Sequence, residues 1–254
     1  MLTKIRQSMN LLVPDGFPNG SKLEQISFRP DHGLQILVVP TTEESVSQLL
    51  AQACDWVAAV GVGNDANKPQ TLSLYGAQIV WNSLRATIIA PPEKTGPILL
   101  ALTDFFLYDA ALSEIETEID DAWPHIKTDA AFAFEFSERA VPKRHELSKR
   151  FEHTVSMRAR LARLAPHVHR LSTHPATITS QLNERLRERT RMVSRFEFLS
   201  SQLDVLEDVY GMCGQRVSDF MLARQQIILE WAIVFLLAAE LLLLVTDLMA
   251  SVGT

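Results

Sequence analysis

Histidines gather in the middle of the chain, where imidazoles at suitable spacing could bind a metal ion. Five of the seven histidines fall within thirty residues: His145, His153, His167, His169 and His174. On a helix, His167 and His169 would point roughly 200° apart around the axis. The ligands of one metal ion must converge, so this spacing does not suit a shared site. We interpret the histidines as a solvated helix face and expect no metal site.

The sequence lacks the common motifs of enzymes. There is no G-x-G-x-x-G and no G-x-x-x-x-G-K-[ST] phosphate loop, and Gly61-Val62-Gly63 is better explained as a turn. No G-x-S-x-G nucleophile elbow occurs. The two cysteines, Cys54 and Cys213, form no C-x-x-C pair, so neither a cysteine zinc site nor a disulfide framework is indicated. These observations predict a protein without catalysis and without a cofactor.

Charge is distributed unevenly along the chain, although the net charge is only −6. Residues 1–138 hold 8 Lys and Arg against 18 Asp and Glu, residues 139–195 hold 14 against 4, and residues 196–254 hold 2 against 8. Three segments of different charge indicate three different physical roles. A run of acids lies within residues 114–121: Glu114, Glu116, Glu118, Asp120 and Asp121. It fits a solvated helix end, or a surface that docks on a basic helix expected over residues 143–170.

Five arginines near the end of the basic segment are candidates for contact with a polyanion. They are Arg185, Arg187, Arg189, Arg191 and Arg195, interleaved with Glu184 and Glu188. RNA phosphates are one partner for such a block, and anionic lipid head groups are another. Lipid contact would require the helix to fold back, because these residues stand roughly 50 Å before the apolar tail along a continuous helix. A solvated coiled-coil face is the third interpretation.

The C-terminal tail is apolar enough to cross a membrane. Seventeen of the nineteen residues 227–245 are apolar, and about 20 residues suffice to span the hydrocarbon layer. The exceptions are Glu230, beside the interface-favouring Trp231, and Glu240, which would lie well inside the bilayer. We therefore predict a transmembrane anchor over residues 227–249. A two-stranded coil would leave Glu240 facing lipid, so either the oligomer is larger, or Glu240 pairs with another subunit or partner, or it is neutral.

The charges beside this segment predict its orientation. Arg216 and Arg224 precede the segment, and no Lys or Arg follows it. By the positive-inside rule, the N-terminal domain should be cytoplasmic, or on the matrix side of the inner membrane in a mitochondrial protein. About nine residues follow Val245, as in a tail-anchored protein.

A heptad seam leads into the apolar tail. Positions spaced alternately by three and four residues are Phe196, Leu199, Leu203, Leu206, Tyr210, Cys213, Val217, Phe220, Arg224, Ile227 and Trp231. Ten of these eleven side chains are apolar or aromatic, and Arg224 is the charged exception. Five heptads of this kind are typical of a coiled coil, which predicts a homo-oligomer. A long helix packed on its own domain would give the same pattern.

The remaining pattern predicts an α+β protein in four segments. Residues 1–33 are rich in Pro and Gly and are expected to form a loop. Strands are expected over 34–39, 56–62, 71–81, 87–90 and 131–136, with helices from Thr41 and over 96–119, giving a small α+β domain over 34–136. Residues 142–226 are expected to form long helices, with a break at Pro175 and a second helix from near Ala176.

Three stretches resemble one known family. Residues 229–234 (LEWAIV), followed by Glu240, are similar to the C-terminal motif of the "required for meiotic nuclear division" / Sad1-interacting-factor family, the domain of unknown function 155. Residues 75–82 (YGAQIVWN) and 203–210 (LDVLEDVY) resemble two further stretches of that family. The resemblance covers roughly residues 34–250 and implies a membrane-anchored, oligomeric protein without assigned catalysis. The shortness of the chain favours a bacterial member over a mitochondrial one.

Together these patterns predict a single-pass membrane protein that acts as a non-enzymatic, oligomerising scaffold. Its expected partners are a membrane, further copies of itself and another protein. The alternative is a membrane-tethered factor that binds RNA or the ribosome and supports translation. The mitochondrial members of the family support organellar translation, so the resemblance is compatible with both functions.

Overall fold

The structure is a computed structural model that describes residues 5–7, 12–29, 32–41, 46–60, 68–134, 142–170 and 177–252. The chain forms two compact units. The first comprises residues 1–114 and 164–197, and the second comprises residues 115–163 and 198–254. A mixed sheet followed by long helices confirms the predicted α+β class.

The first unit is built on a six-stranded sheet with the order β1-β2-β3-β6-β5-β4. The strands are β1 (Ile5–Gln7), β2 (Lys22–Arg29), β3 (His32–Pro40), β4 (Gln70–Leu74), β5 (Ala77–Trp81) and β6 (Arg85–Ala90). β3 and β6 pair in parallel, and the other neighbours are antiparallel. The two parallel strands lie at the centre of the sheet, where almost every residue of β6 is buried.

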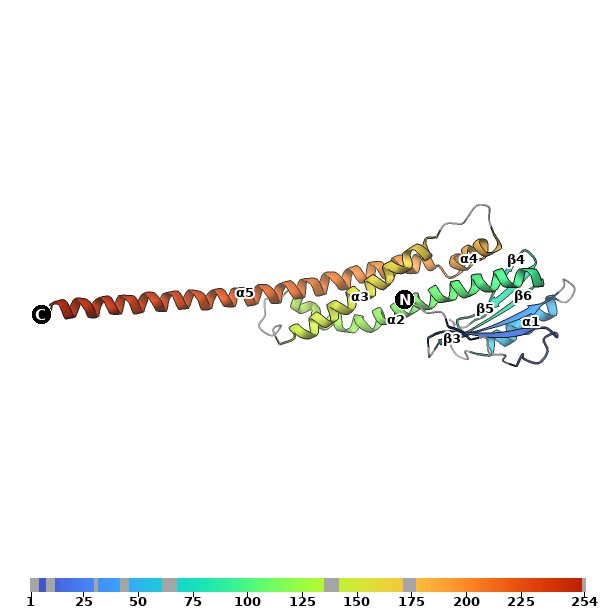
Figure 1. The fold of residues 1–254 in the computed structure, drawn as a ribbon, viewed down its shortest axis with the longest axis horizontal. Helices are drawn as coiled ribbons and strands as arrows, with labels where there is room; N and C mark the ends of the chain where they lie inside the picture. The colour runs from blue at the N-terminus through green and yellow to red at the C-terminus, as the bar shows by residue number, and fades with distance from the viewer. Residues whose placement is uncertain are drawn as a thin grey trace. The chain divides into compact units, whose positions relative to one another are not determined.

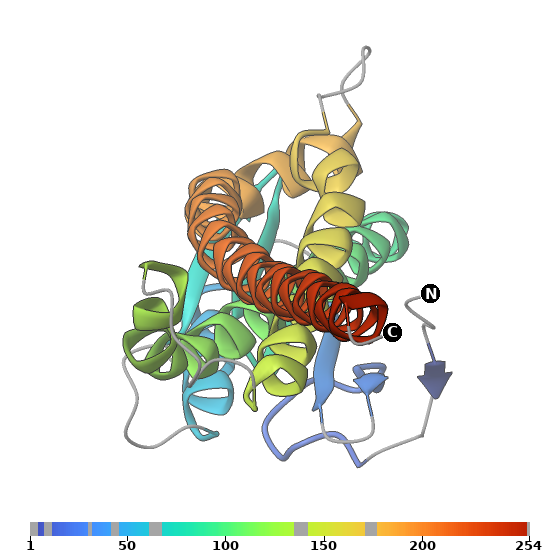
Figure 2. The same cartoon turned by 90° about the vertical axis from the view of Figure 1, so that its left-hand side faces the viewer.

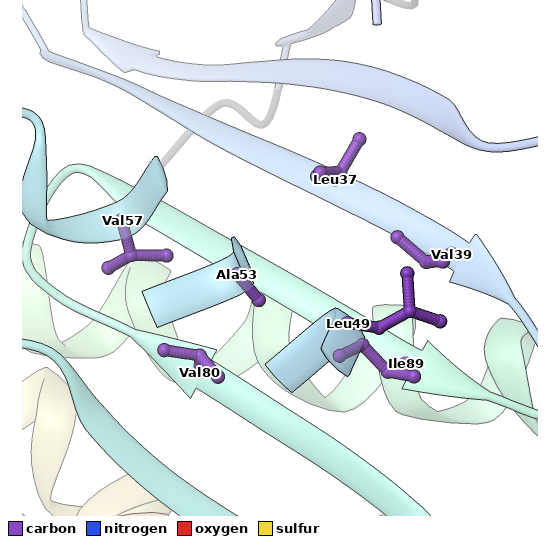
Figure 3. Close-up of a cluster of buried hydrophobic side chains, with 7 residues drawn as sticks. All are labelled: Leu37, Val39, Leu49, Ala53, Val57, Val80 and Ile89. Carbon is purple, nitrogen blue, oxygen red and sulfur yellow. The ribbon is translucent and has the colours of Figure 1, made fainter. Parts of the chain in front are cut away.

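Helices cover both faces of this sheet. Helix α1 (Val46–Ala58) packs on one face, where Leu49, Ala53 and Val57 meet Leu37 and Val80 of the strands (Figure 3). The first half of helix α2 (Pro92–Phe134) lies against the other face (Figure 1). Because side chains alternate along a strand, each central strand supplies apolar residues to both layers. Such double burial accounts for the continuous apolar runs of β3 and β6.

The β4–β5 turn is tight, and side chains that follow β5 cap the end of α1. Tyr75 and Gly76 both have positive φ, which matches the two-residue turns that join antiparallel strands. At the end of β5, the Nδ2 of Asn82 donates to the carbonyl of Val57 at 2.7 Å. Arg85 donates through Nη1 to the carbonyl of Trp56 at 2.8 Å, and its guanidinium lies 4.5 Å from the centre of the Trp56 ring. These donors satisfy carbonyls that the end of a helix leaves open.

The other helices are α3 (Arg144–Val168), α4 (Ile178–Arg189) and α5 (Met192–Val252). In the second unit, α3 and α5 run in opposite directions. Arg158 of α3 pairs with Asp204 of α5 at 2.7 Å, whereas Arg144, fourteen residues earlier, reaches Met221, seventeen residues later. Antiparallel helices with many apolar contacts form the core of this unit.

The predicted heptad seam is buried within the chain for much of its length. Its buried members are Leu199, Leu203, Leu206, Tyr210, Cys213 and Val217. Apolar residues of α2 and α3 in the same unit, such as Ile119 and Met157, are also fully buried. Between residues 199 and 217 the seam is therefore covered within its own chain, as in the alternative of a long helix packed on its own domain. Both arrangements require the same apolar periodicity, so the homo-oligomer stays a prediction.

Two predictions for the N-terminal half were wrong. Residues 1–33 were expected to form a loop, but β1 and β2 lie there, and Ile26 of β2 is fully buried. Pairing with β3 stabilises β2 although its sequence is largely polar. Residues 71–81 were expected to form one strand, but they form the β4–β5 hairpin.

Two expected strands are helical instead. The strand predicted from Trp56 is the end of α1, whose apolar face repeats every four residues through Ala53 and Val57. The strand predicted at residues 131–136 is the end of α2 as far as Phe134, where Ile126, Asp129 and Ala133 follow helical spacing and are buried. Residues 61–62 and 135–136 lie outside the described part of the chain, as does Pro175.

The buried seam gives a direct test of the second unit. Replacing Leu203, which is fully buried, by Ala should lower the free energy of unfolding by about 2 to 5 kcal/mol. The matched control is Ser201→Ala, two residues away on the exposed side of α5, which should change it by about 0.5 kcal/mol or less. Urea unfolding followed by circular dichroism measures both variants.

The same experiment at two protein concentrations separates the two explanations of the seam. Burial within one chain predicts that Leu203→Ala leaves any dependence of the unfolding midpoint on concentration unchanged. A midpoint that rises with concentration and loses this dependence in Leu203→Ala would show that the seam joins copies.

Candidate functional site

The second half of α5 exposes an apolar surface that no other part of the described chain covers. From Arg224 to Leu244 every side chain is exposed, and Trp231 and Phe235 are exposed by 71% and 77%. This part of α5, red in Figure 1, has no described helix or strand beside it, and its end lies nearest the viewer in Figure 2. Within the described residues, α5 is the one helix long and apolar enough to cross a membrane, with a mean hydropathy of 2.5 in its most apolar window.

The four predicted membrane residues lie along this surface. Arg224, Glu230, Trp231 and Glu240 are all exposed. Glu230 accepts a hydrogen bond from Nε2 of Gln226 at 3.2 Å, one helical turn earlier. Glu240 stands about 15 Å further along the helix than Glu230. The helix therefore separates one acid near the start of the apolar surface from another in its interior.

The five candidate arginines divide into two groups. Arg185, Arg189 and Arg191 are exposed, and Arg191 has a positive φ in the turn between α4 and α5. Arg187 and Arg195 are half-buried and make contacts within the first unit. The structure therefore leaves three of the five side chains on the surface.

Arg187 and Arg195 have structural contacts. Nη1 of Arg187 donates to the carbonyls of His167 and Val168 at 3.2 and 3.3 Å, and so caps the end of α3. Burial lowers the pKa of Arg187, a shift that the charge of Glu184 opposes. Arg195 pairs with Asp109 at 2.7 Å and donates to Ser113 at 2.9 Å. These contacts make both arginines part of the fold.

The acid run lies in the middle of α2, not at a helix end, because α2 continues to Phe134. In the second unit, Glu118 forms an ion pair with Arg160 and lies 3.5 Å from His153, both on α3. Docking of the acids on the basic helix is thus confirmed at Glu118. Asp120 and Asp121 are exposed, as expected for a solvated face.

Sequence reasoning missed a buried polar cluster in the second unit. Asp129 of α2, only 2% exposed, forms an ion pair with Arg150 of α3. Nearby, the thiol of Cys213 donates to the carbonyl of Asp129 at 3.5 Å. Burial and then the charge of Asp129 raise the pKa of Tyr210 to about 12 and that of Cys213 to about 11. In the sequence, this cluster is indicated only by the position of Asp129, which lies at helical spacing from the apolar residues Ile126 and Ala133.

Arg150 and Tyr210 of this cluster form part of the wall of an open cavity of about 350 Å³. Its other walls include Glu118, His125 and His153. Cys213 is fully buried and, with its raised pKa, stays a thiol at neutral pH, where a thiolate would be the nucleophile. The arrangement supplies paired charges and a protonated tyrosine, which stabilise helix packing.

The histidines are placed separately. The ring of His167 stacks on that of Tyr108 with centroids 4.1 Å apart, and His169 meets Phe196 edge-on at 5.2 Å. His145 is exposed, and His174 lies outside the described residues. Among the residues that the structure describes, no three His, Cys, Asp or Glu side chains are grouped closely enough to hold a metal ion.

Comparison with known proteins gives little further information. No family model matches the sequence, and no curated protein matches it. One solved structure, described as "structure of the full-length CmaX protein", is similar with 12% sequence identity and a TM-score of 0.42. The match covers 81% of this chain and 76% of that chain. At this level of similarity it supports no conclusion about function.

The buried tyrosine predicts an alkaline limit to stability. Because the fold raises the pKa of Tyr210 from 10 to about 12, the folded state favours the protonated ring. This contribution to stability is complete below pH 10 and is lost as the pH rises to 12, by about 1.4 kcal/mol per pH unit at most. Tyr210→Phe should flatten the pH dependence of the free energy of unfolding in that range.

The raised pKa of Cys213 also lowers the free energy of unfolding as the pH rises from 9 to 11, but it does so equally in Tyr210→Phe and in its control variant. The matched control is Tyr75→Phe, since Tyr75 is 56% exposed in the β4–β5 turn. Equal pH profiles for the two variants would contradict the assignment to Tyr210.

Proposed function

We propose that this protein is a membrane-anchored, non-enzymatic scaffold whose α5 helix crosses the bilayer once. The observation that carries this proposal is the uncovered apolar surface of α5 between Arg224 and Leu244. Monomeric soluble proteins rarely expose apolar patches of more than a few hundred Å². A helix satisfies its own backbone hydrogen bonds, so lipid can cover this surface without an energetic penalty for the backbone.

The composition of the segment favours insertion. Its thirteen Leu, Ile, Val and Phe residues contribute roughly −4 to −8 kcal/mol on the insertion scale. Glu240 costs about 3 kcal/mol near the centre of the bilayer, and less when it is protonated or paired. The apolar residues therefore outweigh the acid. Arg216 and Arg224 before the segment favour a cytoplasmic position for the two units.

The resemblance of residues 229–240 to the family of domain of unknown function 155 agrees with a membrane anchor. Membership of that family is part of the proposal. Its stretch at residues 75–82 corresponds here to the β4–β5 turn, strand β5 and the capping residue Asn82. Its stretch at residues 203–210 corresponds to the buried seam of α5. Residues 75–82 thus contribute to the fold of the first unit, and residues 203–210 contribute to the fold of the second. Residues 229–240 lie in the proposed membrane anchor.

Self-association is the second part of the proposal and involves a different face of α5 from the seam. Phe198, Val205 and Met212 are exposed by 63%, 45% and 37% and are spaced by seven residues. The same heptad position further along the helix is polar at Asp219 and Gln226 and is then occupied by Ile233 and Glu240. An unsupercoiled helix drifts roughly 20° per heptad, so two copies would have to supercoil to keep this stripe in contact. Such packing would place Glu240 beside the Glu240 of a second copy.

Removing the anchor tests the proposal. A fragment ending at Arg224 should remain in the soluble fraction, whereas the full-length protein should sediment with membranes and need detergent for extraction. The fragment should stay folded, because the removed helix contributes no buried residues among those described. Fractionation followed by circular dichroism measures both properties. Membrane retention of the folded fragment, or full-length protein that is soluble without detergent, would contradict the anchor.

Light scattering on the same two proteins tests self-association. Association through the outer stripe predicts that the fragment is an oligomer and that Val205→Lys with Met212→Lys lowers its mass. A fragment that is monomeric at all concentrations would place any contact elsewhere and contradict the outer stripe.

The second candidate function is that of a membrane-tethered factor that binds RNA or the ribosome. The observation that favours it is the exposure of Arg185, Arg189 and Arg191 on α4 and its C-terminal turn. Arginines that contact phosphates release counterions, which makes binding dependent on salt. The other two candidate arginines take part in the fold, so three side chains would carry such contacts.

Reversing the three exposed charges tests this function. The triple Arg→Glu variant should bind single-stranded RNA more weakly and reduce the salt slope by about 2, since each lost contact removes about 0.7. The control reverses three exposed charges elsewhere, at Lys127, Arg163 and Arg216. Filter binding at several salt concentrations measures both. Equal losses in the two variants would show that RNA responds only to net charge.

A further inference from the structure

The first unit contains a cavity of about 180 Å³ that the membrane function does not use. Its walls come from the first half of α2, the end of α3 and the start of α4. Tyr108 and His167 form one side as a stacked pair. Polar side chains of α4, including Ser180 and Asn183, line another side. Most of the side chains that line this cavity are polar, and Phe105 and Met192 are the apolar ones, so the cavity suits a small polar ligand.

Two guanidinium groups border this cavity. Arg170 is exposed and follows α3, whereas Arg187 is half-buried on α4. They lie close enough for the charge of Arg170 to add to the lowering of the pKa of Arg187, which burial mainly causes. Asp104 is the one carboxylate among the lining residues, so the lining has a positive net charge. Two neighbouring cations beside one acid favour an anionic ligand.

The start of α4 adds donors of the matching kind. Thr177 and Ser180 form a capping box in which each side chain accepts from the backbone N–H of the other residue. The box does not use the N–H groups of Ile178 and Thr179, which belong to the first turn of the helix. The positive end of the helix dipole therefore lies at a cavity that already holds two arginines.

Tyr108 supplies a further donor. Burial and then the charge of Asp104 raise its pKa above 10, so its hydroxyl remains protonated at neutral pH. A protonated hydroxyl can donate a hydrogen bond to an anion, whereas a phenolate would repel it. Guanidinium, hydroxyl and backbone N–H groups together match the acceptor oxygens of a phosphate group.

We propose that this cavity is a binding site for a small phosphate-bearing anion, held by Arg170 and Arg187 at the start of α4. Arg187 plays two parts, since Nη1 also caps the end of α3. Arg170 acts in binding alone and pairs its guanidinium with the phosphate. Tyr108 orients the phosphate through its hydroxyl. The site depends on neither the membrane anchor nor the three exposed arginines.

Calorimetric titration of the full-length protein in detergent with inorganic phosphate, at constant ionic strength, tests this site. We expect saturable binding at one site per chain. Arg170→Gln should weaken it by about tenfold or more, because it removes a charge-assisted hydrogen bond to the anion. Tyr108→Phe, which removes only the hydroxyl, should weaken it by a smaller factor.

The matched control is Arg189→Gln, which removes an exposed arginine of α4 that does not line the cavity. Its affinity for phosphate should stay within about twofold of the original protein. Circular dichroism checks that all three variants are folded. Absence of saturable binding, or equal weakening by Arg170→Gln and Arg189→Gln, would overturn the proposal.

Discussion

The apolar surface of one helix determines how this protein is organised. Helix α5 is continuous from Met192 to Val252, yet its apolar side chains meet two different surroundings. Between residues 199 and 217 its seam is buried among side chains of its own chain, and from residue 224 to 244 every side chain is exposed. Exposed apolar surface is unfavourable in water, and the described part of the chain does not cover this surface. Lipid would cover it in the proposed membrane anchor.

The uneven distribution of charge along the chain agrees with the way in which the helices pack. The acidic α2 and the basic α3 pair within the second unit through Asp129 with Arg150 and Glu118 with Arg160. In the first unit, Arg195 pairs with Asp109 of α2. Opposite charges on neighbouring helices therefore help to select which faces meet, as well as keeping the helices soluble. Of the five candidate arginines, Arg185, Arg189 and Arg191 remain exposed, so these three are available to an external partner.

The sequence predicted those parts of the fold in which one periodicity dominates. Strands β3 and β6, the first half of α2 and the apolar end of α5 were identified because their apolar residues are continuous or strongly periodic. Strand β2 was missed because pairing with β3, which is not visible in a single sequence, stabilises a largely polar segment. The alternation at residues 131–134 suggested a strand, but burial at a helical spacing from Ile126 prevailed. The cavity beside Arg170 depends on three helix segments meeting, which no local pattern indicates.

The seam of α5 shows why apolar periodicity alone cannot identify a partner. Leu203 and Val205 are two residues apart, but Leu203 is fully buried within the chain and Val205 is 45% exposed. A heptad pattern records only that one helix face is covered, and neighbouring helices of one chain cover it as well as a second copy does. A surface for a second copy must therefore lie among the apolar residues that the chain leaves exposed. In the second unit, the stripe of Phe198, Val205 and Met212 meets this condition and leads along the same helix toward Glu240.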